Sequence, residues 1–130
     1  MKFLAAAALS AVLAFSQTVV ANHATARWVQ EGGSESVTLR EDPRTGAIEM
    51  LVRYPPGHVF KPHWHNANER MVLIEGRMSL RQGDGPETFL EPGGYAFLPA
   101  KEVQRTACVS KTRCAFYVYW DAKLDFHPAP

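Results

Sequence analysis

The sequence is poor in cysteine and has no excess of charge of either sign. Its 130 residues include only two cysteines and carry 14 basic against 13 acidic side chains. The basic residues are scattered, so we expect no clustered basic face that nucleic acid or an anionic membrane would bind. The length predicts a single domain.

Long apolar runs are also absent, except near the N-terminus. Residues 3–15, FLAAAALSAVLAF, contain no charged residue and follow Lys2. The run stops at polar residues 16–18, short of the about 20 apolar residues that a membrane-spanning helix needs. We therefore interpret residues 1–21 as a signal peptide, with cleavage after Ala21 or as late as residue 26.

Two further absences limit the possible routes of export. No cysteine lies near either cleavage site, which excludes a lipid-modified cysteine, and no twin arginine precedes the apolar run. We expect the chain to be threaded unfolded through the general secretory route. Cleavage after Ala21 would leave 109 of the 130 residues as a periplasmic or secreted protein. Once the signal peptide is removed, no membrane attachment is expected.

Helical periodicity is missing from the rest of the chain. Short alternating stretches, such as SVTLRE at 36–41 and AIEMLVRY at 47–54, are separated by turns rich in glycine and proline. Many short strands at regular spacing predict an all-β sandwich or small barrel. Residues 122–130 lack this pattern, and we expect them to form a loose C-terminal tail.

The two cysteines, Cys108 and Cys114, flank the sequence VSKTR, which we interpret as the tip of a hairpin. That symmetry would place them directly opposite each other on antiparallel strands, within reach of a disulfide. An oxidising compartment favours the bridge. The alternative is a pair of buried free thiols.

Histidine is scarce as well, but two of the five histidines lie two positions apart, at His63 and His65. Residues two apart on a strand point to the same face, and Glu69 can rejoin them after the turn-prone NAN at 66–68. Two imidazoles and one carboxylate with open coordination positions suit iron(II) and similar divalent ions. The alternative is three ordinary polar residues on a solvated strand.

The spacing of these residues resembles the first motif of the cupin superfamily, G-x5-H-x-H-x3-E-x6-G. Its five fixed positions are Gly57, His63, His65, Glu69 and Gly76. The chain is similar to small exported single-domain bacterial cupins over residues 37–121. This resemblance implies an antiparallel double-stranded β-helix, the jelly-roll or cupin barrel, with a metal inside its mouth.

The second cupin motif, G-x5-P-x-G-x2-H-x3-N, is degenerate. Gly93 and Pro99 are present, but Lys101 replaces the glycine, Gln104 replaces the fourth ligand histidine and Cys108 replaces the asparagine. Gln104 can coordinate only through a neutral carbonyl oxygen, or bond a metal-bound water or substrate, and it cannot carry a proton. We interpret Lys101 as a surface substitution in a loop of ordinary geometry.

The resemblance implies a divalent transition metal: iron, manganese, nickel, zinc or copper. Three arrangements stay open. All of His63, His65, Glu69 and Gln104 ligate the metal, or only the first three do, or the metal site is lost and the barrel serves another purpose. The order of affinities favours copper and zinc, whereas facial geometry favours iron, so no single metal is selected.

The first functional hypothesis is an exported metal-dependent cupin that acts on a small molecule, as a dioxygenase, a lyase or an isomerase. The alternative is a non-enzymatic periplasmic module that binds or senses a ligand on the same barrel, and a third reading is a purely structural barrel. The fold does not choose between them. An enzyme should place a further titratable group near the open position, and the sequence identifies no clear one.

Two expectations concern the surroundings of the barrel. Arg53, Arg70 and Arg105 are the polar residues we would test first near the mouth. Small cupins pair through edge strands, so the resemblance also implies a homodimer.

Overall fold

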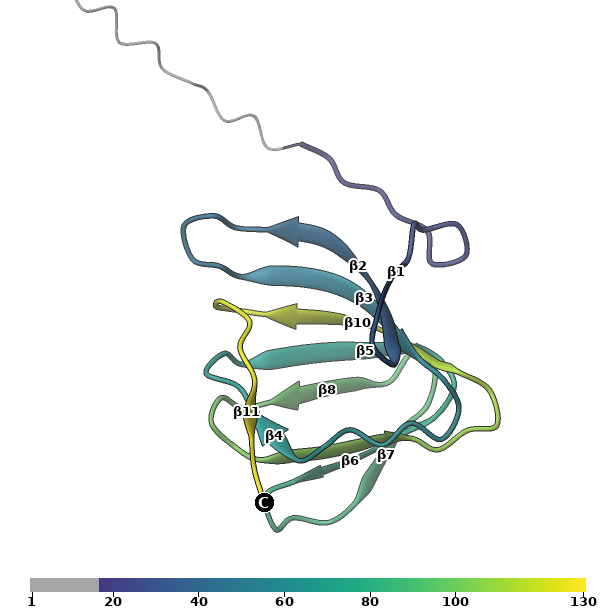
Figure 1. Cartoon of the computed structure of the whole chain (residues 1–130), viewed down its shortest axis with the longest axis vertical. Helices are drawn as coiled ribbons and strands as arrows, with labels where there is room; N and C mark the ends of the chain where they lie inside the picture. Colours follow the sequence, from purple (N-terminus) through teal and green to yellow (C-terminus); the bar gives the residue numbers. More distant parts are fainter. Residues whose placement is uncertain (1–16) are drawn as a thin grey trace, which may run out of the picture.

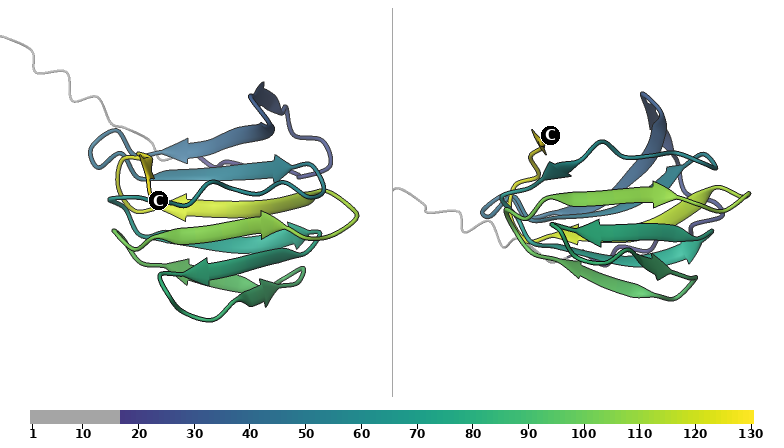
Figure 2. Two further views of the ribbon diagram at one scale, coloured as in Figure 1. Left: turned by 60° about the horizontal axis from the view of Figure 1, so that its bottom comes forward. Right: turned by 90° about the horizontal axis from the view of Figure 1, so that it is seen from below.

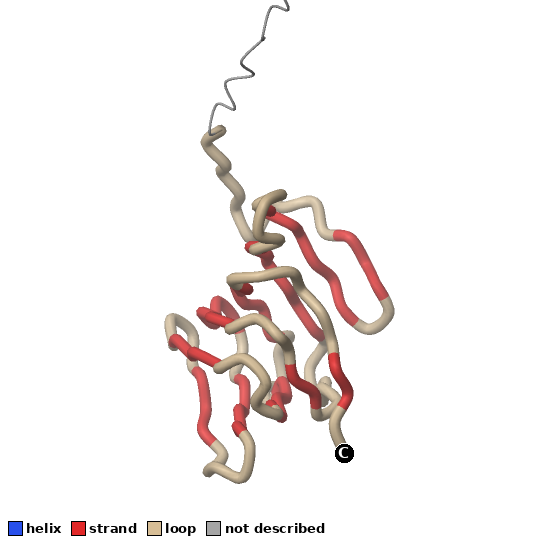
Figure 3. Tube along the Cα trace, turned by 90° about the vertical axis from the view of Figure 1, so that its left-hand side faces the viewer, coloured by secondary structure: helices blue, strands red, loops and turns tan. Residues whose placement is uncertain are grey.

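The structure, a computed structural model, describes residues 17–130 and is all-β over that range (Figures 1 and 3). The apolar run predicted as a signal peptide lies outside the described residues. Across residues 17–130, no helix has the length and apolar character needed to cross a membrane. The strands are β1 (Val29–Glu31), β2 (Ser34–Glu41), β3 (Ile48–Tyr54), β4 (His63–Trp64), β5 (Glu69–Glu75), β6 (Met78–Gln82), β7 (Thr88–Leu90), β8 (Tyr95–Leu98), β9 (Gln104–Cys108), β10 (Cys114–Trp120) and β11 (His127–Pro128).

The strands form two antiparallel sheets, seen as layers in Figure 2. One sheet has the order β1-β2-β3-β10-β5-β8 and the other has the order β11-β4-β9-β6-β7. Consecutive strands such as β5 and β6, or β9 and β10, lie in different sheets, so the chain repeatedly crosses from one layer to the other. This arrangement confirms the predicted antiparallel jelly-roll barrel.

Alternation along the central strands builds the core between the sheets. In β10, the buried positions include Phe116, Val118 and Trp120, whereas Tyr117 and Tyr119 are half-exposed on the outer face. Strand β5 beside it alternates in the same way and buries its inward side chains. This is the period of two expected for strands with one face on the core.

Glycines occupy left-handed positions at the predicted turns, with φ values of 76° at Gly57, 88° at Gly76 and 85° at Gly93. At Gly76 the surroundings also exclude a side chain, because a Cβ would lie 2.5 Å from the Arg113 carbonyl oxygen. Pro99 directly follows β8, where the chain leaves the sheet.

The expectation of ordinary backbone geometry at Lys101 is wrong. Lys101 has a φ of 65°, and within residues 17–130 it is the one non-glycine residue with positive φ. Its N–H donates to the carbonyl oxygen of His65 at 2.7 Å. Lys101 therefore adopts the left-handed conformation expected of the motif glycine. That conformation costs a residue with a Cβ about 1–2 kcal/mol.

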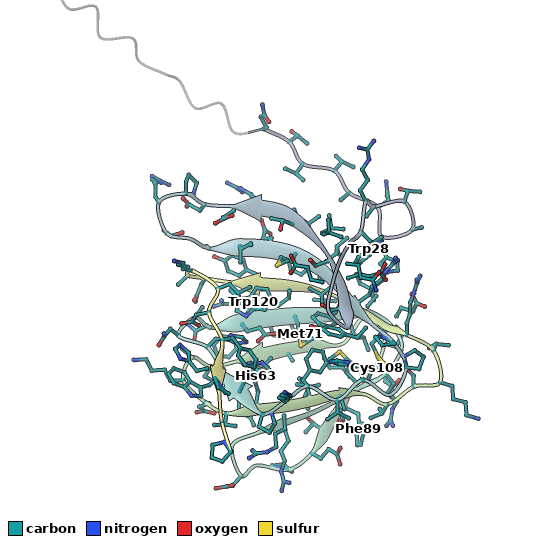
Figure 4. All side chains as sticks on the ribbon, viewed as in Figure 1. Trp28, His63, Met71, Phe89, Cys108 and Trp120 are labelled. Atoms are coloured by element: carbon teal, nitrogen blue, oxygen red, sulfur yellow. A yellow bond between two sulfur atoms is a disulfide. The ribbon has the colours of Figure 1, made fainter. Side chains whose placement is uncertain are left out.

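The disulfide is present, but the predicted hairpin is wrong. Cys108 and Cys114 are bonded, with their Cα atoms 5.8 Å apart. Cys108 ends β9 in the five-stranded sheet, whereas Cys114 begins β10 in the six-stranded sheet. The connection crosses between layers, so the bond joins the two sheets. Figure 4 shows Cys108 at one side of the barrel and His63 and Trp120 at the other.

The C-terminal segment, residues 122–130, also differs from the expected loose tail. Strand β11 pairs with β4, with His127 opposite Trp64. The two rings stack with centroids 3.9 Å apart, and the Ala129 N–H donates to the Pro62 carbonyl oxygen at 2.9 Å. In Figure 1 this segment, in yellow, runs across one end of the barrel beside β4. It completes the five-stranded sheet rather than leaving the domain.

Candidate functional site

The four predicted ligand residues meet at the end of the barrel opposite the disulfide. Strand pairing places His63 of β4 directly opposite Gln104 of β9. Glu69 begins β5 in the facing sheet, opposite Trp120 at the end of β10. His63, His65, Glu69 and Gln104 are 6%, 7%, 5% and 4% exposed, respectively. The structure thus brings all four together, buried between the two sheets.

These side chains line a cavity of about 390 Å³. Most of its remaining wall is apolar and comes from both sheets and the C-terminal segment, including Phe60, Met71, Phe116, Trp120 and Phe126. A buried polar cluster on an otherwise apolar concave wall is typical of small-molecule sites in proteins.

Backbone carbonyls fix the orientation of both imidazoles. His63 Nδ1 donates to the carbonyl oxygen of Lys61 at 2.6 Å, and His65 Nδ1 donates to the carbonyl oxygen of Asp125. A carbonyl oxygen can only accept, so each Nδ1 carries the proton and each Nε2 keeps a free lone pair. Burial lowers the pKa of both histidines, so both rings are neutral at neutral pH.

Glu69 is a buried carboxylate held by an amide. Gln104 Nε2 donates to Glu69 Oε2 at 2.9 Å, and His65 Nε2 lies 3.6 Å from the same oxygen. Burial raises the pKa of Glu69, and the hydrogen bond from Gln104 opposes that rise. The Trp120 indole N–H, on the same wall, also lowers the pKa of Glu69, but it completes no hydrogen bond among the described residues. A buried carboxylate without a cationic partner is costly, and a bound cation would offset that cost.

The ligand atoms that His63, His65 and Glu69 offer are of the types that bind divalent transition metals. Two unprotonated imidazole nitrogens and one carboxylate are suitable ligands, and hydrogen bonds from both Nδ1 atoms to carbonyls are the usual support of ligating histidines. Within residues 17–130, however, no group of three or more His, Cys, Asp or Glu side chains already has the geometry of a metal site. The side chains would have to close around the ion on binding.

Comparison with known families agrees with the fold. Residues 16–123 match the family described as the ChrR cupin-like domain. The chain belongs to this family. Cupin-family members commonly bind metals and act on small molecules.

This ChrR cupin-like domain is similar to part of a longer protein. It is 34% identical over 98 residues to the DNA damage-repair/toleration protein DRT102 of Arabidopsis thaliana, a match that covers 75% of this chain but only 29% of that protein. The chain thus spans less than a third of that relative's length.

Solved structures share the fold at low identity. The cupin domain of Cnp3 from Schizosaccharomyces pombe superposes with a TM-score of 0.70 at 12% identity, covering 82% of this chain and 75% of that one. The polyketide cyclase RemF from Streptomyces resistomycificus gives a TM-score of 0.69 at 19% identity, covering 88% and 87%. At these identities the likeness establishes the cupin fold alone.

In this cupin domain, sequence reasoning missed two parts of the cavity wall. Tyr54, the last residue of β3, lines the cavity, and burial, with a smaller effect of Glu69, raises its pKa. Phe126 also lines the cavity and stacks on His63 with ring centroids 4.7 Å apart. Strand parity along β3 could have identified Tyr54, because Val52 lies two positions before it on the same wall. No sequence pattern indicated that Phe126 would fold back.

The three arginines expected near the mouth do not line the cavity; other groups in the described part of the chain engage them. Arg53 donates to Glu35 at 2.6 and 3.0 Å. Arg70 lies 3.4 Å from the Asp121 carboxylate. Arg105 donates to the carbonyl oxygens of Gly83 and Pro130.

Proposed function

We propose that the protein is an exported metal-binding cupin that acts on a small molecule through a divalent transition metal in the barrel. One observation carries this proposal. His63, His65 and Glu69 are buried together on the wall of a 390 Å³ cavity, and backbone carbonyls hold both histidines as Nε2 donors. Membership of the ChrR cupin-like family supports it further.

The Nε2 atoms of His63 and His65 and the carboxylate of Glu69 would hold the ion. A bound divalent ion would supply Lewis-acid polarisation of a substrate oxygen. We assign Gln104 the task of orienting Glu69, because its amide nitrogen donates to that carboxylate. This assignment favours the arrangement with three protein ligands, which leaves one more coordination position open than a full set of four.

The remaining residues of the site would exclude water and hold the ligands in place. Asp125, through its backbone carbonyl, keeps His65 in the tautomer with a free Nε2. Phe126 covers the face of His63. A site with little water strengthens every electrostatic interaction within it.

An enzyme fits the cavity better than a purely binding module does. General acid–base catalysis uses a titratable group besides the ligands, and Tyr54 and Asp125 are the further titratable residues among those that line the cavity. We therefore favour an oxidoreductase, lyase or isomerase over the alternative of a non-enzymatic periplasmic sensor.

We also propose that the protein is periplasmic or secreted and forms a homodimer. The apolar residues 3–15 support export. The Cys108–Cys114 disulfide is of the kind that persists in oxidising compartments.

Elemental analysis of the exported protein tests the metal assignment. Wild type should carry close to one equivalent of a transition metal, and His63→Ala should lose it. His58→Ala is the control, because His58 is a half-buried histidine that does not line the cavity. Equal metal content in wild type and His63→Ala, or no metal in wild type after reconstitution with zinc, iron and manganese, would refute the proposal.

A further inference from the structure

The cavity has a polar end and a long apolar body. Glu69 lies opposite Trp120 at one end of β10, whereas Tyr54 lies opposite Cys114 at the other end of the same strand. Both Glu69 and Tyr54 line the cavity, and Met71 and Phe116 lie on the wall with them. The volume of about 390 Å³ is near the lower limit of the range of roughly 300–1,000 Å³ for small-molecule sites. Such a space suits a molecule of one or two rings.

Cationic side chains are missing from this wall. Among the described residues that line the cavity, none is lysine or arginine. The carboxylate of Asp125, also on the wall, is engaged by Asn66 and His127. A ligand with a carboxylate or phosphate on its apolar body would leave that charge unpaired, which is strongly unfavourable. Sugar-like ligands would bury more hydroxyls than Tyr54 and Thr106, the hydroxyl-bearing residues of this wall, could pair.

Aromatic rings give the wall its shape. The rings of Tyr54 and Phe116 are close to parallel, with an interplanar angle of 9° and centroids 6.2 Å apart. At the polar end, Phe126 is stacked on His63 at an interplanar angle of 24°. Flat rings pack well against aromatic faces in offset or edge-on contact. Away from the predicted ligands, Tyr54 and Thr106 are the cavity-lining residues that carry a hydroxyl.

We propose that the cavity binds a flat, one- or two-ring aromatic molecule that carries a hydroxyl or enolic oxygen at one end and no charged group at the other. The proposal rests on the proposed function in one respect, namely that this oxygen faces His63, His65 and Glu69. The apolar body and the absence of cations hold with or without a metal.

Two matched probes test the proposal, 2-naphthol and 6-hydroxy-2-naphthoate, which differ only by a carboxylate at the far end. Titration calorimetry on the full exported protein should show 2-naphthol binding at least about ten-fold tighter, because the carboxylate finds no partner. Equal or tighter binding of the naphthoate overturns the proposal. Absence of 2-naphthol binding up to millimolar concentration also overturns it.

The same titrations after chelation separate this inference from the proposed function. Elemental analysis of each sample reports the metal independently. A preference for 2-naphthol in samples without metal would support the inference while the metal assignment fails. Loss of the preference in metal-loaded samples would refute the inference while the metal assignment stands.

A third probe, 2,6-dihydroxynaphthalene, tests the role of Tyr54. It should bind a few-fold tighter than 2-naphthol, and Tyr54→Phe should abolish that gain. Tyr117→Phe is the matched control, because the Tyr117 hydroxyl donates to Glu49 away from the cavity. If Tyr54→Phe still binds 2,6-dihydroxynaphthalene more tightly than 2-naphthol, the second hydroxyl of the probe does not contact Tyr54.

Discussion

Replacing Lys101 with glycine should stabilise the protein. Lys101 adopts a φ of 65°, and a left-handed conformation costs a residue with a Cβ about 1–2 kcal/mol. Glycine relieves this strain, but it loses more backbone entropy on folding than alanine does, which costs about 0.5–1 kcal/mol. The net expectation is a rise of about 0.5–1 kcal/mol in the free energy of unfolding.

Urea denaturation, followed by tryptophan fluorescence, measures this difference. With a slope of about 2 kcal/mol per molar urea, the midpoint should rise by roughly 0.3–0.5 M. Lys101→Ala distinguishes backbone strain from the effect of the charge, because it removes the charge but keeps the Cβ. It should not raise the free energy of unfolding. A Lys101→Gly variant no more stable than wild type, or a Lys101→Ala variant equally stabilised, would refute the argument from backbone strain.

Three further predictions concern the bridge, the outer face and the C-terminal segment. Reducing the disulfide, whose cysteines are six positions apart, should lower the free energy of unfolding by about 2 kcal/mol; urea midpoints that are the same with and without dithiothreitol would contradict this. Burial and the hydrogen bond to Glu49 raise the pKa of Tyr117. The stabilisation from protonated Tyr117 is therefore complete below the tyrosine pKa of the unfolded chain, about 10, and is lost as the pH rises beyond that value. Tyr117→Phe should therefore weaken the loss of stability between pH 9 and 11, and melting curves that decline as steeply as those of wild type would exclude the effect. Deleting residues 125–130 removes the carbonyl that fixes His65 and should weaken zinc binding by about 10–100-fold in calorimetric titration; unchanged affinity would show that this hydrogen bond is dispensable.

Local spacing was enough to predict an all-β sandwich or barrel and the polar cluster, and the resemblance to the cupins implied the jelly roll. The motif from Gly57 to Gly76 carries the family's fixed residues, and strand parity alone places His63 and His65 on one face. Both are buried on the cavity wall with Glu69. The disulfide was also predictable, because the two cysteines flank a short connection whose ends must lie close together.

The features that were missed depend on contacts between distant parts of the chain. The sequence of the turn between β9 and β10 fits both a hairpin and a crossing between sheets. The prediction of a hairpin was wrong because the two strands enter different sheets. Strand β11 is two residues long, too short for any periodicity, and its pairing depends on β4. The backbone of Lys101 is set by its hydrogen bond to His65; lysine itself gives no indication of positive φ.

The position of the disulfide makes the two ends of the barrel unequal. The bond ties the two layers at the end of the barrel far from His63 and Glu69. At the end that holds these two residues, the layers are held by weaker links such as the hydrogen bond between Gln104 and Glu69. A covalent bond restrains the separation of the layers near Cys108 and Cys114 more strongly than a hydrogen bond does near His63. The predicted ligands therefore lie at the end of the barrel farthest from this covalent restraint.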